Sequence, residues 1–238
     1  MPECFSYDEK TGTLTLYPSI TITTTESLEE TRLKPAHVCF AEGDWSRKDD
    51  IINRILKIVC RENRFLKSCD LPNSVTKIVK KAFFRCDNLT SINIPAGVTE
   101  IGEKAFCRCN LTSVNIPAGV TKIGDGAFSD CSSLTSITLP DSVTGIGNFA
   151  FWGCSNLTKI TFCGYLVNIG RGIFEGCSEL QTIEVCSKNM QKKISEYIAK
   201  AGLNVSVVVS QNTQTNPNGS VPCRKKIPTV ILCNNRGR

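Results

Sequence analysis

Cysteine is the residue type with the most evident capacity for chemistry in this chain. The 238 residues include fourteen cysteines but only one histidine, His37. Histidine is the usual general base near neutral pH and a frequent metal ligand, so a single copy excludes most histidine-dependent chemistry. Cysteine can act as a nucleophile, bind a metal ion or form a disulfide. The spacing of the fourteen residues separates these roles.

Metal binding and thiol catalysis are both poorly supported by the spacing. No Cys-x-x-Cys pair is present, and the closest pair, Cys107-x-Cys109, should face opposite sides of the backbone. We therefore expect no metal site and no cofactor. His37 and Cys39 would share one face of a strand, as a base and a nucleophile must, but no third member or oxyanion motif stands nearby. We expect a structural pair, and an enzyme with its chemistry in residues 1–70 stays as an alternative.

Five cysteines recur at intervals of 22 or 23 residues. Rungs stacked ~4.8 Å apart would bring their Cα atoms within disulfide range, but the Cα–Cβ vectors would run parallel and disfavour the bond. We therefore expect reduced thiols that pack as small hydrophobic side chains. The five are Cys86, Cys109, Cys131, Cys154 and Cys177.

The other nine cysteines are irregularly spaced. Cys163 and Cys186 fall at the same repeat position and should be neighbours, and Cys223 and Cys233 could pair across a hairpin. A reducing compartment explains so many unpaired thiols most simply, which predicts an intracellular protein. A secreted or cell-surface location is the alternative. The first twenty residues lack the basic start and apolar core of a secretory signal, and no apolar run approaches the ~18 residues of a membrane span.

The regular cysteines belong to an internal repeat. Five consecutive units of 22 or 23 residues begin at Leu71, Ile94, Ile116, Leu139 and Phe162, and a representative copy reads IPAGVTKIGDGAFSDCSSLTSIT. Seven positions of each unit are apolar or cysteine. No single helix or strand has that spacing, but a coil that turns these side chains inward and stacks each turn on the next does.

Each unit contains three kinds of local pattern. The stretch LTSINIP is rich in β-forming residues and ends at a proline, which predicts a strand. The stretch VTEIG predicts a second short strand ended by a glycine, where positive φ costs little. The stretch EKAFCRC predicts a single helical turn, α or 3₁₀.

The motif LPxSVTxIGxxAFxxCxxLTSIx resembles the BspA-like branch of the leucine-rich repeat family, over residues 71–185. The resemblance implies an α/β fold, a curved right-handed solenoid of short parallel strands and single helical turns, here capped by a helix at each end. It also implies a protein that binds other macromolecules without catalysis, on bacterial surfaces, among secreted proteins or in parasitic protists. In the last unit Cys163 replaces proline and Ile173 replaces alanine, so we expect a less regular final rung.

The flanking segments predict caps. Residues 1–70 read as a β-rich lead-in followed by a helix over 46–67, whose apolar face would close the N-terminal end. The repeats occupy 71–185. Residues 186–210 read as an amphipathic capping helix and a strand. Residues 211–238 form a basic tail that we expect to be mobile.

The net charge of +6 is concentrated at the C-terminal end. Residues 1–70 carry −2, 71–185 are neutral, and 186–238 carry +8. Arg224, Lys225 and Lys226 could contact an anionic membrane surface or an acidic protein. The tail lacks interleaved aromatic residues, so nucleic acid is not an expected partner.

These features predict a non-enzymatic protein–protein interaction module whose partner the sequence does not identify. A host-directed effector of a bacterium or protist is one setting, and a surface adhesin whose leader was removed is the other. The expected binding face is the outward side of the LTSINIP strands. It comprises Ser91, Asn93, Ser113, Asn115, Ser136, Thr138, Lys159, Thr161, Thr182 and Glu184.

Overall fold

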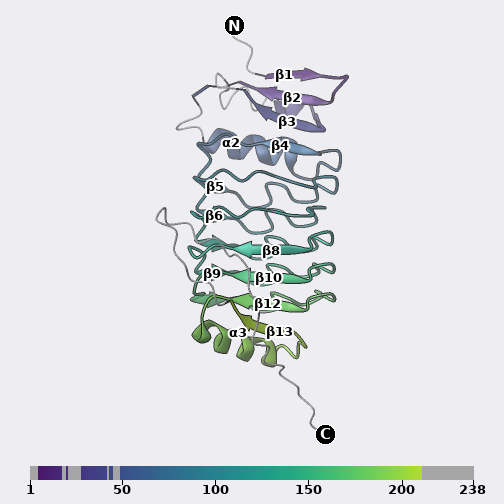
Figure 1. Ribbon diagram of the computed structural model, residues 1–238. Helices are drawn as coiled ribbons and strands as arrows, with labels where there is room; N and C mark the ends of the chain where they lie inside the picture. Colours follow the sequence, from purple (N-terminus) through teal and green to yellow (C-terminus); the bar gives the residue numbers. More distant parts are fainter. Residues whose placement is uncertain (1–4, 18–19, 21–27, 42, 45–48, 211–238) are drawn as a thin grey trace.

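Stacked rungs, each about one sequence repeat long, form the body of the molecule (Figure 1). The computed structural model describes residues 5–17, 20, 28–41, 43–44 and 49–210. The tail at 211–238, with Arg224, Lys225 and Lys226, lies outside the described residues. So do Cys4, Cys223 and Cys233. Within the described part, no helix is long and apolar enough to cross a membrane.

The second predicted strand forms in every unit. The strands β5 (Lys77–Ile78), β6 (Glu100–Ile101), β7 (Lys122–Ile123), β9 (Gly145–Ile146) and β11 (Asn168–Ile169) make one parallel sheet. Their isoleucines pair one repeat apart, Ile78 with Ile101 and so on along the stack. The apolar period therefore sets the register.

The first predicted strand forms only in the later units. A second parallel sheet contains β8 (Ser136–Leu139), β10 (Lys159–Phe162), β12 (Thr182–Val185) and β13 (Ser206–Val209). The first copy is reduced to a bridge between Asp70 and Asn93, and the second copy, 113–117, is not a strand. The second unit also has one residue fewer between Cys109 and Leu111, directly before that segment.

The predicted helical turn is absent, and the third side of each rung is a run of tight turns. Alternate N–H groups of this segment donate hydrogen bonds to the next rung. Phe106 N–H donates to the Ala127 carbonyl of the next rung at 2.8 Å, whereas Ala105 N–H donates within its own rung. Lys104 and Arg108 have φ of +54° and +61°, which reverses the helical sense twice. A helix would satisfy its bonds internally, whereas this path joins neighbouring rungs.

The predicted apolar ladders form the core. The phenylalanine rings Phe83, Phe106, Phe128, Phe151 and Phe174 are buried and stack at 5.3, 5.3, 5.6 and 6.4 Å between centroids. The cysteine ladder lies beside them, four members buried and Cys177 half-buried. Cys131 Sγ donates to the Phe106 carbonyl at 3.1 Å, and Cys109, Cys154 and Cys177 bond a carbonyl of the rung before them in the same way. Cys86 bonds the Cys60 carbonyl, which lies before the first rung. No disulfide joins the cysteines that the structure describes.

The glycine that ends each short strand has a different role from the one we predicted. Gly124 does not adopt positive φ, and a Cβ there would lie 2.6 Å from the Glu103 nitrogen of the rung before. The close approach of two backbones, rather than a left-handed turn, therefore requires glycine.

The N-terminal end differs from the predicted helical cap. The helix comprises α2 (Asp49–Ile55) and a π-helical continuation, η1 (Leu56–Cys60). It ends at Cys60 because Arg61 leaves the helical conformation, with φ of −59° and ψ of 131°. The buried Asn63 follows, and its Nδ2 donates to the Val59 carbonyl at 3.0 Å and to the Pro35 carbonyl at 2.7 Å. A four-stranded sheet with the order β1 (Phe5–Asp8), β2 (Thr13–Leu16), β3 (His37–Phe40) and β4 (Ser68–Asp70) lies at this end (Figure 1). The hairpin of β1 and β2 lies on the side of this sheet away from the repeats. A hairpin, not a helix, is the outermost element.

At the other end, α3 (Lys188–Lys200) covers the last rung (Figure 1). Met190, Ile194 and Ile198 form its buried face. Its Tyr197 hydroxyl accepts a hydrogen bond from Ile173 N–H at 2.9 Å, which continues the ladder of inter-rung bonds where no further repeat follows. The helix thus replaces the missing neighbour with both an apolar face and an acceptor.

Candidate functional site

The predicted binding face on the strands is polar. Its exposed members are Ser91, Asn93, Ser113, Asn115, Ser136 and Thr138. Lys159, Thr182 and Glu184 are half-buried. Lys159 and Glu184 form an ion pair at 2.6 Å, so the two charges of this face are directed at each other.

One member of the predicted face is buried, contrary to expectation. Thr161 lies in β10 between Thr138 and Glu184 on the two paired strands and is 5 % exposed. Its hydroxyl donates to the Glu184 carboxylate at 3.2 Å. A partner on this face would meet Glu184 and Lys159 before Thr161.

His37 and Cys39 lie on β3, and each contacts the next strand rather than the other. His37 Nδ1 is 2.8 Å from Ser68 Oγ, and Cys39 Sγ donates to Asp70 at 3.6 Å. Burial and the neighbouring Asp70 carboxylate raise the pKa of Cys39, which favours the thiol over the nucleophilic thiolate. No group of three His, Cys, Asp or Glu side chains among the described residues is placed to hold a metal ion.

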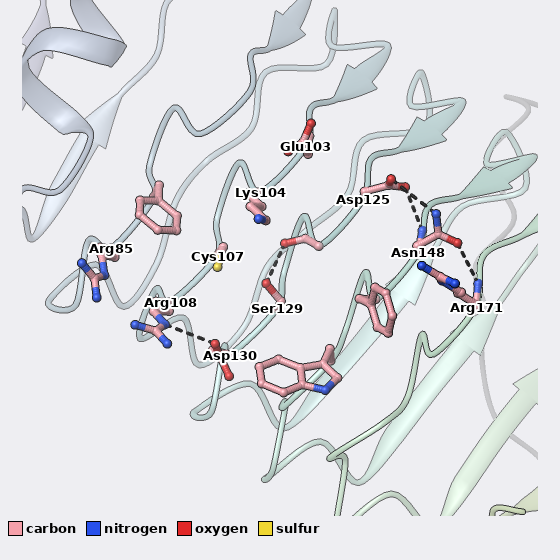
Figure 2. Close-up of a pocket in the computed structure, with 14 residues that line it drawn as sticks. Arg85, Glu103, Lys104, Cys107, Arg108, Asp125, Ser129, Asp130, Asn148 and Arg171 are labelled. Carbon is pink, nitrogen blue, oxygen red and sulfur yellow. Dashed lines mark hydrogen bonds and ion pairs between the residues drawn. The ribbon is translucent and has the colours of Figure 1, made fainter. Parts of the chain in front are cut away.

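The turn segments of consecutive repeats line a groove of about 830 Å³ (Figure 2). Stacking places equivalent residues of successive units side by side, so one row reads Phe84, Cys107, Ser129 and Trp152. The middle of this row is small, and its ends are large aromatic side chains. We call this feature the turn-side groove.

A second row deepens the turn-side groove. Lys104, Gly126 and Phe149 follow one another in it, and Gly126 has φ of +58°, with Lys104 Cγ and Ser129 Oγ each 3.3 Å from where its Cβ would be. Phe149 has φ of +56°, an unusual value for a bulky residue. A Cβ on Gly172 would lie only 2.4 Å from a carbon of the Phe149 ring. The glycine in the following unit therefore leaves room for this ring.

The two aromatic ends define the length of the turn-side groove. Phe84 and Trp152 adjoin Phe83 and Phe151 in the sequence, and these two core rings are separated by three steps of 5.3, 5.3 and 5.6 Å, roughly 16 Å. An extended chain rises ~3.3 Å per residue, so about five residues fit between the ends. Trp152 is 42 % exposed, which leaves much of its indole available for contact.

Charged and polar side chains form the two rims. Arg85, Arg108 and Asp130 lie along one side, and Arg108 pairs with Asp130 at 3.2 Å (Figure 2). The other side carries Glu103, Asp125, Asn148 and Arg171 (Figure 2).

Hydrogen bonds to the next rung hold that second rim in place. Asp125 accepts from the Asn148 backbone N–H at 2.8 Å, and Asn148 Oδ1 accepts from the Arg171 N–H at 3.0 Å. Each side chain thus fixes the following rung, and the rim is held rather than free to rotate.

Cys107 and Ser129 lie in the floor of the turn-side groove (Figure 2). Burial raises the pKa of the Cys107 thiol, although the Ser129 hydroxyl partly offsets this rise. The Ser129 hydroxyl donates to the Gly126 carbonyl at 3.0 Å. The floor is therefore a neutral surface of small side chains, suited to contact rather than to nucleophilic attack.

The sequence reasoning missed this groove because it assigned the turn segment a purely structural role. A signal was present in the repeats themselves. At the position of Phe84 the later units carry cysteine, serine, tryptophan and glutamate, whereas the outward strand positions of the first three units carry only serine, asparagine and threonine. The most varied outward positions of a regular repeat were the better candidates for a specific surface.

Comparison with protein families and solved structures agrees with the fold. The model of the BspA type leucine rich repeat region, in six copies, matches residues 54–181 and 99–218. No curated protein has a matching sequence.

Three solved bacterial structures are similar. A leucine rich cell surface protein from Faecalibacterium prausnitzii is 31% identical over 53% of this chain and 34% of its own, with a TM-score of 0.51. A leucine-rich repeat protein from Eubacterium ventriosum is 24% identical over 76% and 41%, with a TM-score of 0.50. The pneumococcal vaccine antigen PcpA is 18% identical over 74% and 51%, with a TM-score of 0.51. The chain thus spans between about a third and a half of these proteins.

Proposed function

The chain belongs to the BspA-type leucine-rich repeat family, and from this premise we propose that it binds a protein partner, without catalysis, in the turn-side groove. Repeat modules of this family are generally binding modules. The observation that carries the proposal is the groove itself, with Trp152 and Phe84 at its ends and Arg108 on its rim. Tryptophan and arginine are the residue types most enriched among interface hot spots.

The scaffold supports tight binding because the groove is already formed. Every second N–H of the turn segments bonds the neighbouring rung, as Arg108 does to Ser129 at 2.9 Å and Asp130 does to Trp152 at 2.6 Å. A backbone held this firmly loses little conformational entropy on binding. The open sides of the groove suit a segment of a larger molecule.

The strand face remains a second candidate surface for the same function. Its six exposed side chains form two regular polar rows, and its charges are limited to the paired Lys159 and Glu184. Polar rims of this kind surround hot spots and contribute little affinity themselves. We therefore rank the turn-side groove first.

The cellular setting is a further part of the proposal. The relative from F. prausnitzii is described as a cell surface protein and is 31% identical over about half of this chain. That likeness favours the surface alternative, in which the protein acts as an adhesin, and the comparisons do not support the intracellular expectation. An effector role stays as the second form of the same binding function.

Affinity capture with matched variants tests the proposal. Immobilised full-length protein is compared with Trp152→Ala, which removes one end of the groove, and with Asn115→Arg, which places a bulky charge on the strand face. We expect proteins that the unmodified chain and Asn115→Arg retain to be lost by Trp152→Ala, with at least tenfold weaker affinity for the purified partner. Circular dichroism confirms that both variants fold. Loss with Asn115→Arg and retention with Trp152→Ala would transfer the function to the strand face.

A further inference from the structure

The acidic groups around the turn-side groove are already engaged. Glu103 pairs with Lys80 at 2.7 Å, and Asp130 pairs with Arg108 at 3.2 Å. Asp125 accepts two hydrogen bonds from Asn148, at 2.8 Å from its backbone N–H and 3.4 Å from its side-chain amide. A partner therefore meets carboxylates whose charge or hydrogen-bonding capacity is in part used.

Three of the four basic side chains that line the groove, by contrast, have no acidic partner among the described residues. Among the described residues no carboxylate lies within ion-pair distance of Arg85, Lys104 or Arg171. Figure 2 shows Arg85 near one end of the groove, Lys104 in its middle and Arg171 near the opposite end. Four cations and three carboxylates line the groove, so its formal charge is +1, and Asp125 keeps its negative charge because its hydrogen bonds come from a neutral amide. The basic side chains without a carboxylate partner are spread from one end of the groove to the other.

The two arginines are also held in place by neighbouring rings. The Arg85 guanidinium lies 5.7 Å from the centroid of the Phe84 ring, and that of Arg171 lies 5.6 Å from the Phe149 ring. Stacking on a ring leaves the N–H donors at the guanidinium edge available, and this edge matches the geometry of a carboxylate. Aromatic side chains thus fix the direction of two anion-binding groups.

We propose that the occupant of the turn-side groove is an extended acidic segment of the partner protein, an inference that rests on the proposed function. About five residues lie between the aromatic ends, with carboxylates near both ends and in the middle. At least one aromatic or branched side chain packs against the wall of Phe149 and Trp152. Charge complementarity with Arg85, Lys104 and Arg171 favours a negatively charged segment. The roughly 16 Å between the aromatic ends sets the length of the segment that the groove holds.

An acidic glycan could supply the same carboxylates, and one sugar ring could stack on Trp152. The edge of a sugar ring carries polar hydroxyls, whereas an aromatic or branched side chain covers the wall of Phe149 and Trp152 with apolar surface. We therefore favour the peptide, and the experiment includes both.

Selection from a phage-displayed library of random nine-residue peptides tests the proposal on the full-length protein. We expect enrichment of peptides with two or more Asp or Glu residues and at least one aromatic residue. Enriched peptides, labelled with fluorescein, are then measured by anisotropy at low and physiological salt. Their isosteric Asn and Gln versions serve as charge controls, and a uronic-acid oligosaccharide is the competing ligand.

Variants locate the charges. We expect Arg85→Gln and Arg171→Gln each to weaken binding about threefold to tenfold and to reduce its salt dependence, because exposed charge interactions are screened over ~8 Å. Arg64→Gln is the matched control, since Arg64 is 69% exposed and pairs with Asp87 of the turn beyond the groove. It should leave binding unchanged. None of the three variants should shift the melting temperature by more than a degree or two.

Four results would overturn the inference: no enrichment, enrichment of neutral or basic peptides, binding of the oligosaccharide in place of peptide, or equal affinity in the arginine variants. The failure of the proposed function is separable. If Trp152→Ala abolishes partner capture while no acidic peptide binds, the acidic segment is wrong and the groove stands. If Trp152→Ala leaves capture intact, the groove itself is wrong.

Discussion

Replacement of Phe128 by alanine tests the rung geometry most directly. Phe128 is the middle ring of the phenylalanine ladder and is fully buried. Its ring lies 5.3 Å from that of Phe106 and 5.6 Å from that of Phe151, nearly parallel to both. The substitution therefore removes two ring contacts at once and leaves a void in the centre of the stack.

The expected loss of stability follows from how far the void can close. Phenylalanine-to-alanine changes in a core cost about 3–5 kcal/mol, and the cost grows with the residual cavity. Here the backbone on both sides is fixed, since Phe128 N–H bonds Ala150 and Phe106 N–H bonds Ala127, each at 2.8 Å. Neighbouring rungs cannot move together without breaking such bonds, so we expect a loss toward the upper part of that range.

Two other phenylalanines provide controls. Phe84 follows the ladder residue but is only half-buried, so Phe84→Ala should cost less than about 1.5 kcal/mol. Phe174 contacts one parallel ring at 6.4 Å and the edge of Tyr197, and its alanine variant should lie between the two.

Urea unfolding, followed by circular dichroism and tryptophan fluorescence, gives the free energy of unfolding and its slope with urea concentration, the m-value. Repeat proteins couple mainly through adjacent units, so a central defect can also lower the slope by letting the two halves unfold separately. A loss below about 1 kcal/mol for Phe128→Ala, or one no larger than for Phe84→Ala, would refute the stacking geometry.

Four further substitutions probe the backbone, the thiols and the groove. Gly124→Ala should destabilise the protein by about 1–3 kcal/mol, whereas Gly145→Ala, whose Cβ would meet nothing within 4 Å, should be neutral or slightly stabilising in the same unfolding assay. Burial raises the pKa of Cys131 far above the ordinary 9.0, so alkylation at pH 8 should require unfolding. The unfolded thiol ionises first, so stability should fall as pH rises above 9, by up to about 1.4 kcal/mol per pH unit, and this contribution should vanish in Cys131→Ala. Phe149→Gly relieves a φ of +56° and should cost less than about 1 kcal/mol while weakening partner binding at least fivefold by calorimetry.

The buried part of the fold could be predicted because its apolar residues recur at a regular interval in the sequence. Each ladder position recurs at a fixed interval, and a side chain such as Phe106 or Cys131 is buried wherever its rung is stacked between two others. The parallel sheet of short strands follows from the same register. These features depend on repetition, which one sequence shows in full.

The path of the turn segment could not be predicted from that period. The letters EKAFCRC favour a helical turn by propensity, but the inter-rung bonds of Phe106 and Arg108 overrode it. Propensity is worth a few tenths of a kcal/mol per residue, less than a row of backbone hydrogen bonds repeated along the stack. The helix predicted over 46–67 is too long for a similar reason, since Asn63, just after the observed helix, bonds Pro35, which lies 28 residues away in the sequence.

The turn-side groove lies where the repeat departs from its own pattern. A perfect repeat would present the same side chain on every rung and so a uniform ridge, without ends. Here one rung carries the small residues Gly126 and Ser129, and the next carries the large Phe149 and Trp152, although Phe149 occupies a backbone position that glycine takes in the units on either side. Lys81 and Lys104 adopt the same left-handed φ at this position in the first two units, so the conformation belongs to the repeat and only the aromatic side chain is particular to Phe149. The core therefore encodes the stack through regularity, and the surface encodes recognition through the few residues that break it.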